Sequence, residues 1–174
     1  MIYYSNYYET LITNNSPYYE YDGKIGLGDI KRFVGDYHKR RRAEVCIHEL
    51  GVGRHRFDFV SLNPYTHHVR ILEYKMTKED FNGDTKHLGY MHYCNTLAFV
   101  TPLGLIGIND LKDKNIGLMQ IFKWAHKTRK QEKWYLGAIW VKRPKGRKLE
   151  ERIYYKVVDM MMARVVQGRK EDFF

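Results

Sequence analysis

The sequence predicts an α/β fold in which helices flank a mixed β-sheet, and two observations lead to this prediction. The first is the order of hydrophobic patterns along the chain: a helical segment, three strand-like segments in quick succession, a second helical region and another strand. The second is the composition, because 174 residues that are 44% hydrophobic can form one buried core but are too few for two full domains. We therefore expect one domain over residues 28–174, preceded by an N-terminal arm over residues 1–27.

The N-terminal arm is rich in tyrosine and in turn-forming residues, and it has no clear period. We interpret it as an arm that packs over the domain. The alternative is a stacking surface for unpaired bases, which aromatic side chains can provide. The tyrosines are Tyr3, Tyr4, Tyr7, Tyr8, Tyr18, Tyr19 and Tyr21.

The first helix is expected over residues 29–41, where apolar residues recur at helical spacing. Asp29 suits its N-cap or first turn, because an acid is favourable at that end of a helix. Residues 38–42 are basic, at the end where cations stabilise a helix in any case. The apolar residues are Ile30, Phe33, Val34 and Tyr37.

Three strands are expected next, over residues 44–50, 54–62 and 68–75, with turns between them. In the second strand, alternation places Phe57 and Phe59 on one face and Asp58 on the other.

In the third strand, Leu72 and Tyr74 are expected to enter apolar packing. The same alternation turns Glu73 and Lys75 together to the opposite face.

The rest of the chain continues the α/β pattern. Residues 77–94 are polar and then helical, residues 96–101 form an apolar strand, and a last helix covers about 149–166. Further short strands are expected near residues 105–108, 116–122 and 134–141.

Asp58, Glu73 and Lys75 form the constellation with chemical meaning. The turn between their strands allows Asp58 to lie beside Glu73, and Lys75 shares the face of Glu73. Two neighbouring carboxylates repel and resist desolvation unless a cation joins them. Hard oxygen ligands suit Mg²⁺ or Mn²⁺, so we expect Asp58 and Glu73 to ligate such a metal. Lys75 can then orient a water molecule and stabilise developing charge.

At these residues the sequence resembles the MmcB-like DNA repair proteins, a branch of the PD-(D/E)xK nuclease superfamily. The resemblance covers about the middle third of the chain. The matching motifs are Arg56-x-Asp58, Glu73-Tyr74-Lys75, Asp80-Phe81, Asp84-x-Lys86, Tyr90-x-x-Tyr93-Cys94 and the strand from Leu97 to Pro102. One departure is that Phe57 stands where the superfamily's name has proline.

The resemblance implies a restriction-endonuclease-like core with a mixed β-sheet flanked by helices. It implies a metal-dependent DNA endonuclease acting in repair or junction processing, with Asp58, Glu73 and Lys75 catalytic. Superfamily members often add an acid from the first helix, for which Asp29 and Asp36 are candidates. Glu49, in the first strand, is a rival.

The charge of the chain indicates a polyanionic partner. Its net charge is +10, which suits the phosphates of DNA. Lys86 and Tyr90 are four residues apart and would share one side of a helix beside the catalytic face. The residues expected to contact nucleic acid are Arg56, Lys86, Tyr90, Lys127, Arg129 and Lys130. The alternative function is a non-catalytic nucleic-acid-binding module on a nuclease-like fold, and a homodimer is compatible with either function.

The cysteine content and the termini indicate a cytoplasmic protein. Only Cys46 and Cys94 are present, which is no disulfide framework, and neither a signal peptide nor a membrane-length apolar run is visible. A weaker alternative is a zinc site that joins Cys46-x-His48 to His92-x-Cys94.

Overall fold

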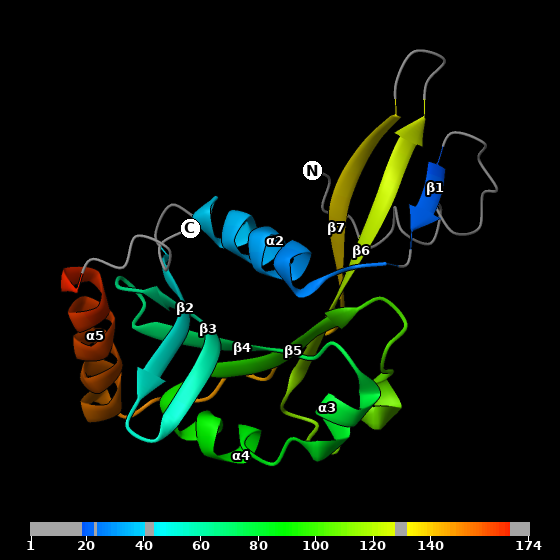
Figure 1. Ribbon diagram of the computed structural model, residues 1–174. Coiled ribbons are helices and arrows are strands. Elements are labelled where there is room, and N and C mark those ends of the chain that lie inside the picture. Colours follow the sequence, from blue (N-terminus) through cyan, green and yellow to red (C-terminus); the bar gives the residue numbers. More distant parts are fainter. Residues whose placement is uncertain (1–18, 23, 41–43, 128–131, 168–174) are drawn as a thin grey trace.

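A seven-stranded mixed β-sheet forms the centre of the protein (Figure 1). The structure is a computed structural model, and it describes residues 19–22, 24–40, 44–127 and 132–167. The strand order is β1-β6-β5-β4-β3-β2, and β7 also pairs with β6. The strands are β1 (Tyr19–Asp22), β2 (Val45–Val52), β3 (His55–Asn63), β4 (His68–Tyr74), β5 (Thr96–Pro102), β6 (Gly117–Lys127) and β7 (Glu132–Lys142).

The strand directions explain why the sheet is mixed. β2, β3 and β4 form an antiparallel meander, whereas β4–β5 and β5–β6 are parallel pairs. The parallel β4–β5 pair needs a crossover, which is supplied by the helical region between them. β6 is long enough to pair with β5 through its first half and with β1 through its second half.

Helices cover both faces of the sheet, as the sequence predicted. Helix α2 packs one face through Ile30, Phe33 and Val34, which are at most 1% exposed. The short helical segments and α5 cover the other face, where Tyr90 and Val157 join the core. The helices are α2 (Leu27–Lys39), α3 (Lys78–Gly83), α4 (His87–Tyr90), η1 (Met91–Tyr93), η2 (Ile108–Asp110) and α5 (Glu151–Val166). The predicted α/β class with a mixed, helix-flanked sheet is confirmed.

The predicted alternation in β3 is wrong at one point. Phe57 packs edge-on against Tyr90, with ring centroids 4.9 Å apart, and belongs to the core on the α5 face. Phe59 contacts His38 and belongs to the core on the α2 face. The cause lies in the neighbouring strand, where Glu49 has a φ of 56°, in the left-handed region. At this position the alternation of side chains between the two faces of the sheet shifts by one residue in both strands. The pairing register between β2 and β3 is the same before and after this position.

Two further segments differ from the prediction or extend it. Residues 105–108 are not a strand but a turn that leads into η2, because Gly104 has a φ of 75° and redirects the chain directly after β5. Within the N-terminal arm, the described residues Tyr19–Asp22 form β1 and add to the sheet. The other predicted arm tyrosines lie outside the described residues.

No helix in the described ranges has the length and apolar character that a membrane span requires.

Candidate active site

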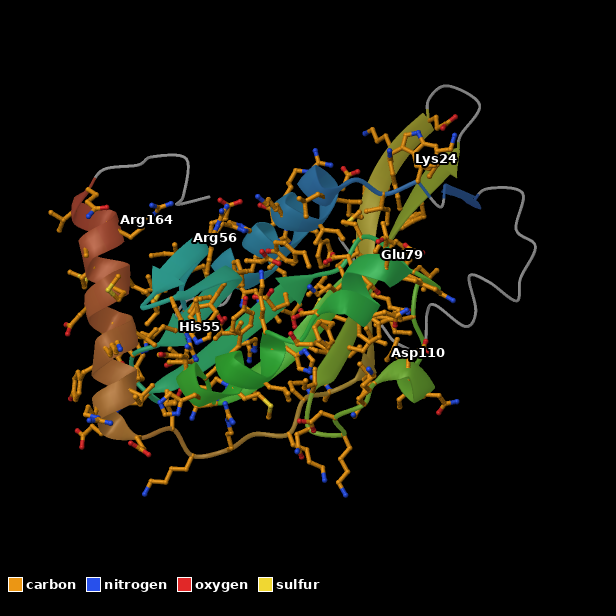
Figure 2. All side chains as sticks on the ribbon, turned by 60° about the horizontal axis from the view of Figure 1, so that its bottom comes forward. Lys24, His55, Arg56, Glu79, Asp110 and Arg164 are labelled. Atoms are coloured by element: carbon orange, nitrogen blue, oxygen red, sulfur yellow. The ribbon has the colours of Figure 1, made fainter. Side chains whose placement is uncertain are left out.

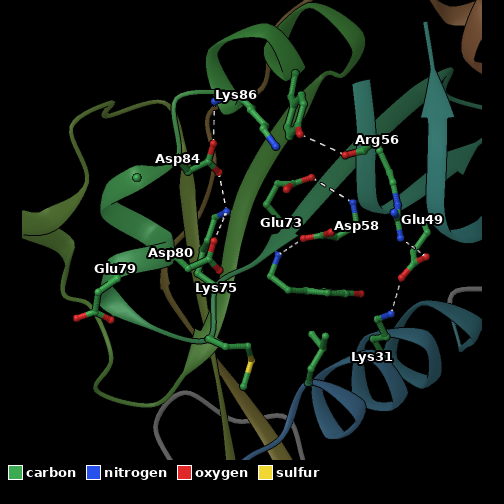
Figure 3. A pocket seen from close by; sticks show the side chains of 15 residues that line it. Lys31, Glu49, Arg56, Asp58, Glu73, Lys75, Glu79, Asp80, Asp84 and Lys86 are labelled. Atoms are coloured by element: carbon green, nitrogen blue, oxygen red, sulfur yellow. Dashed lines mark hydrogen bonds and ion pairs between the residues drawn. The ribbon is translucent and has the colours of Figure 1, made fainter. Parts of the chain in front are cut away.

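A cavity of about 570 Å³ opens where β3 and β4 separate (Figure 3). The β3–β4 ladder ends at the pair Phe59–Leu72, so Asp58 and Glu73 lie directly beyond the last paired residues. Strands β2, β3 and β4, the N-terminal half of α2 and the α3–α4 region supply the walls. The lining residues are Leu27, Lys31, Glu49, Arg56, Asp58, Glu73, Tyr74, Lys75, Met76, Glu79, Asp80, Gly83, Asp84, Lys86 and Tyr90.

Asp58 and Glu73 are held together by each other's strand. The backbone N–H of Asp58 donates to Oε1 of Glu73 at 3.2 Å. In the reverse direction, the backbone N–H of Tyr74 donates to Oδ2 of Asp58 at 2.8 Å. These two bonds replace the backbone ladder where the strands diverge, and they fix both carboxyl groups on the cavity wall.

Burial makes the negative charge on this pair costly. Glu73 is only 4% exposed, and burial, together with the charge of Asp58, raises its pKa to about 9. Burial also raises the pKa of Asp58, despite the opposing hydrogen bond from Tyr74 and the charge of Lys75. Without a bound cation, the pair therefore retains protons that an exposed carboxyl would lose.

Lys75 is positioned by the loop after β4. Its ammonium lies 2.7 Å from Oδ2 of Asp84 and 3.4 Å from Oδ1 of Asp80. Burial alone would lower the pKa of Lys75, but the hydrogen bond and charge of Asp84 outweigh it and the pKa is raised. Lys75 thus remains a cation although its side chain is only 8% exposed.

Asp84 is a site residue that the sequence reasoning used only as part of a motif. Its other oxygen accepts the backbone N–H of Lys86 at 2.8 Å and of His87 at 3.3 Å. One oxygen of the Asp84 carboxylate therefore stabilises the turn before α4, and the other oxygen holds the Lys75 ammonium. The signal in the sequence was an Asp three residues before the first residue of a helix, which is a common turn motif and does not reveal a distant lysine partner.

Lys86 and Tyr90 lie beside the pair, as the sequence predicted. Figure 3 shows the ammonium of Lys86 directed into the cavity toward Glu73. The Tyr90 hydroxyl donates to the carbonyl of Arg56 at 3.2 Å, which ties α4 to β3. Burial, together with the charges of Glu73 and Asp84, raises the pKa of Tyr90 to about 12, so the phenol stays protonated.

The opposite wall carries an ion-pair network centred on Glu49. Its carboxylate lies 2.7 Å from Nζ of Lys31, on α2, and 2.5 Å from Nη2 of Arg56, on β3. The hydrogen bond from Lys31 and the one from Arg56 together outweigh burial and lower the pKa of Glu49. Figure 2 shows Arg56 on the side of α2, whereas its neighbour His55 lies toward α4, where its ring contacts Tyr90.

The three candidates for an additional acid are placed differently. Glu49 lines the cavity. Asp29 instead caps the N-terminus of α2 by accepting the backbone N–H of Gly26 at 3.3 Å, and it pairs with Arg32. Asp36 lines a separate cavity between α2 and β7. The sequence could not separate them because helical phase alone does not give the distance from α2 to β3.

Three of the residues that were predicted to contact nucleic acid lie at the end of β6 or after it in the sequence. Lys127 ends β6, but its side chain lies outside the description, as do Arg129 and Lys130. Another basic residue of β6 is described: Nζ of Lys123 lies 5.1 Å from the centroid of the Trp134 ring.

The zinc site suggested by the two cysteines does not form. Cys46 packs with the core on the α2 face, whereas Cys94 is buried in the core on the α5 face. A different group, His38, Glu44 and Cys46, has ligand atoms that all lie within 4.8 Å of one another. Arg70 also contacts the Glu44 carboxylate at 3.3 Å, so this acid already has a cationic partner.

Comparisons with known proteins show the fold. No protein-family model matches the chain, and none of the curated proteins compared with it matches. Among solved structures it is similar to SPO1766, a protein of unknown function from Silicibacter pomeroyi, with a TM-score of 0.62 and 19% sequence identity. The match covers 83% of this chain and 89% of that chain. The two chains therefore share one fold over most of their length.

Proposed function

We propose that the protein is a metal-dependent DNA nuclease whose reaction centre is the cavity between β3 and β4. The observation that carries this proposal is the meeting of Asp58 and Glu73 at the point where their strands separate, with Lys75 directly after the strand that carries Glu73. A binding surface for phosphate has no need of two buried carboxyl groups, because they are costly to desolvate and would repel phosphate when ionised.

The donor set fits a hard divalent cation. Both groups are carboxyl oxygen donors, they share one wall of an open cavity, and burial raises the pKa of each despite the nearby charge of Lys75. Asp58 and Glu73 would hold Mg²⁺ or Mn²⁺. The bound ion would polarise the scissile phosphate and lower the pKa of a water molecule.

The remaining groups of the cavity have complementary tasks. Lys75 holds a permanent positive charge at the buried end, where it can orient the attacking water and stabilise charge that develops on the phosphate. Asp84 positions Lys75. Lys86 and Arg56, both exposed at the rim, offer cationic contacts to the flanking phosphates, which place the backbone without reading its sequence.

The second candidate function is a non-catalytic nucleic-acid-binding module. It is favoured by the net charge of +10 and by the cations at the rim. It leaves the buried Asp58–Glu73 pair without a use, which is why the nuclease is preferred.

The test is cleavage of labelled linear, nicked, branched and single-stranded DNA by purified protein with Mg²⁺ or Mn²⁺, and with EDTA. We expect metal-dependent cleavage that is lost in Asp58→Asn. Glu151→Gln, an exposed acid at the start of α5, is the matched control and should cleave as the parent does. Equal cleavage by parent and Asp58→Asn would place the chemistry elsewhere. Binding without cleavage under every condition would favour the module.

A further inference from the structure

A second cavity, of about 240 Å³, lies between α2 and the β6–β7 hairpin. Figure 1 shows this hairpin extending beyond the meander, with α2 beside its base. The proposed cleavage chemistry does not use this cavity. Its lining residues are Arg32, Asp36, Lys123, Trp134, Tyr135 and Leu136.

The aromatic wall of this cavity is accessible and is held in place. Trp134 is 40% exposed although it is one of the largest side chains, and Nζ of Lys123 lies over its ring. Tyr135 stacks on Trp124 of the paired strand, with centroids 4.8 Å apart and planes 24° apart. Phe122 lies against Gly137, where a Cβ would meet the ring at 2.5 Å, so the two strands are closely packed below the cavity.

The polar groups around this wall match the parts of a nucleotide. An indole face can stack on any base, because every base has a π-face. Lys123 and Arg32 provide positive charge for the phosphate, and the Arg32 side chain is 67% exposed. Asp36 provides a carboxylate that can accept a hydrogen bond from an exocyclic amino group of a base. A base inside a duplex cannot use this wall, since both of its faces are covered by its neighbours in the stack.

Helix α2 connects the two cavities. Lys31 lines the catalytic cavity and the next residue, Arg32, lines the second one. Consecutive residues of a helix are only about 1.5 Å apart along its axis. Because a helix has 3.6 residues per turn, their side chains also project about 100° apart, so the two cavities lie on adjoining sides of α2 and one nucleic-acid strand that wraps around α2 here would contact both.

We propose that the cavity at Trp134 binds an unpaired nucleobase, so that the preferred substrate is nucleic acid with a single-stranded segment beside the cleavage site. The second part rests on the proposed nuclease function, whereas the binding of the base does not.

The experiment measures binding by fluorescence anisotropy of the full chain in EDTA, so that cleavage plays no part. The probes are a labelled oligothymidylate of about 15 nucleotides, within the range of known single-strand sites, and a blunt duplex of equal length. Trp134→Ala should weaken single-strand binding about 10-fold and leave duplex binding nearly unchanged. Trp134→Phe, which keeps an aromatic face, should retain most of the affinity.

The matched control is Tyr65→Ala, which removes an aromatic side chain that is 85% exposed in the β3–β4 turn. It should bind both probes as the parent does. Equal single-strand affinity of Trp134→Ala and Tyr65→Ala would overturn the proposal, as would a parallel loss of duplex binding in Trp134→Ala.

The failure of the nuclease is distinguishable from the failure of the base site. If no variant or metal gives cleavage but Trp134→Ala still weakens single-strand binding selectively, the base site stands without the nuclease. If cleavage depends on Asp58 but Trp134→Ala binds and cleaves single-stranded and duplex probes as the parent does, the nuclease stands without the base site.

Discussion

Two glutamates line the same cavity, and their environments are opposite. Glu49 lies between Lys31 and Arg56, and these hydrogen bonds lower its pKa. Glu73 lies beside Asp58, has no cation in ion-pair contact among the described residues, and has a pKa raised to about 9. The Glu49 carboxylate is already balanced by two cationic side chains, which fits a structural role. A buried carboxyl group without such a partner marks a place where a metal cation would bind. The difference indicates which wall of the cavity would perform the proposed chemistry.

The largest expected effect separates these two glutamates by activity. Glu73→Gln should lower metal-dependent cleavage about 1000-fold or more, since several kcal/mol of charge stabilisation depend on the metal. Glu49→Gln should change it less than about 10-fold, because it loses only partly exposed ion pairs. Single-turnover cleavage rates measure both. Comparable losses in the two variants would break the distinction between the walls.

The next largest effect concerns the buried ammonium group of Lys75. Asp84→Asn removes the nearer of the two charge partners of Lys75, and the side chains of Asp84 and Lys75 are both less than 9% exposed. Breaking a buried pair should lower the free energy of unfolding by about 3 kcal/mol. The pKa of Lys75 should fall, and the pH–rate profile should shift to lower pH at its alkaline limb. Urea denaturation and the pH profile give the two measurements. Asp110→Asn, on η2, is the control, because its carboxylate only caps Gly107.

A smaller effect is the pH dependence of stability. In the folded metal-free protein Glu73 keeps its proton up to about pH 9, whereas an unfolded chain loses it near the ordinary value of 4.5. The folded state therefore binds more protons between these values, and the free energy of unfolding should fall as pH rises through them. The fall should be at most about 1.4 kcal/mol per pH unit between these values, and Glu73→Gln should remove it.

Divalent cation should counteract this pH dependence. Binding to the ionised pair stabilises the folded state by mass action, so the rise in Tm with Mn²⁺ should grow between pH 6 and about pH 9. A pH-independent rise in Tm would show that the ion binds somewhere other than the Asp58–Glu73 pair. Thermal melts at several pH values, with and without metal, decide between these outcomes.

The smallest effect tests the ion-paired wall. Arg56→Ala should change the free energy of unfolding by less than about 1 kcal/mol, because its side chain is 69% exposed and such pairs contribute little. DNA affinity should fall by a few-fold, and the salt dependence should become less steep by about one phosphate contact. Affinity measured over a salt series gives both quantities. An unchanged slope would remove Arg56 from the nucleic-acid interface.

Local periodicity predicted the site best where the strand is regular. Glu73 lies in a strand whose side chains alternate between the two faces of the sheet without interruption, and Lys75 follows that strand directly, so their shared face follows from the pattern. The same reasoning failed for Phe57, because the positive φ of Glu49 in the neighbouring strand changes the face of both strands. A backbone conformation of this kind has no signature when the residue is not glycine.

Partners that come from separate elements were also beyond the sequence. Lys31 meets Glu49 across 18 positions of the chain, and Asp84 reaches Lys75 from a loop. Neither pairing follows from spacing, because each depends on how a helix or loop packs against the sheet. The assignment of DNA, of the metal and of catalysis remains a prediction that the experiments above test.

The pairing of β1 with β6 has a consequence for how the chain is made. Tyr19 pairs with His126, about a hundred residues later in the sequence, so β1 cannot join the sheet until β6 has been synthesised. Every residue that lines the catalytic cavity lies between Leu27 and Tyr90, and the strands that carry them are synthesised before β6. The proposed reaction centre can therefore assemble on the ribosome ahead of the β6–β7 hairpin. During that interval the outer edge of β5 is uncovered, and this is when the nascent chain is most exposed to aggregation.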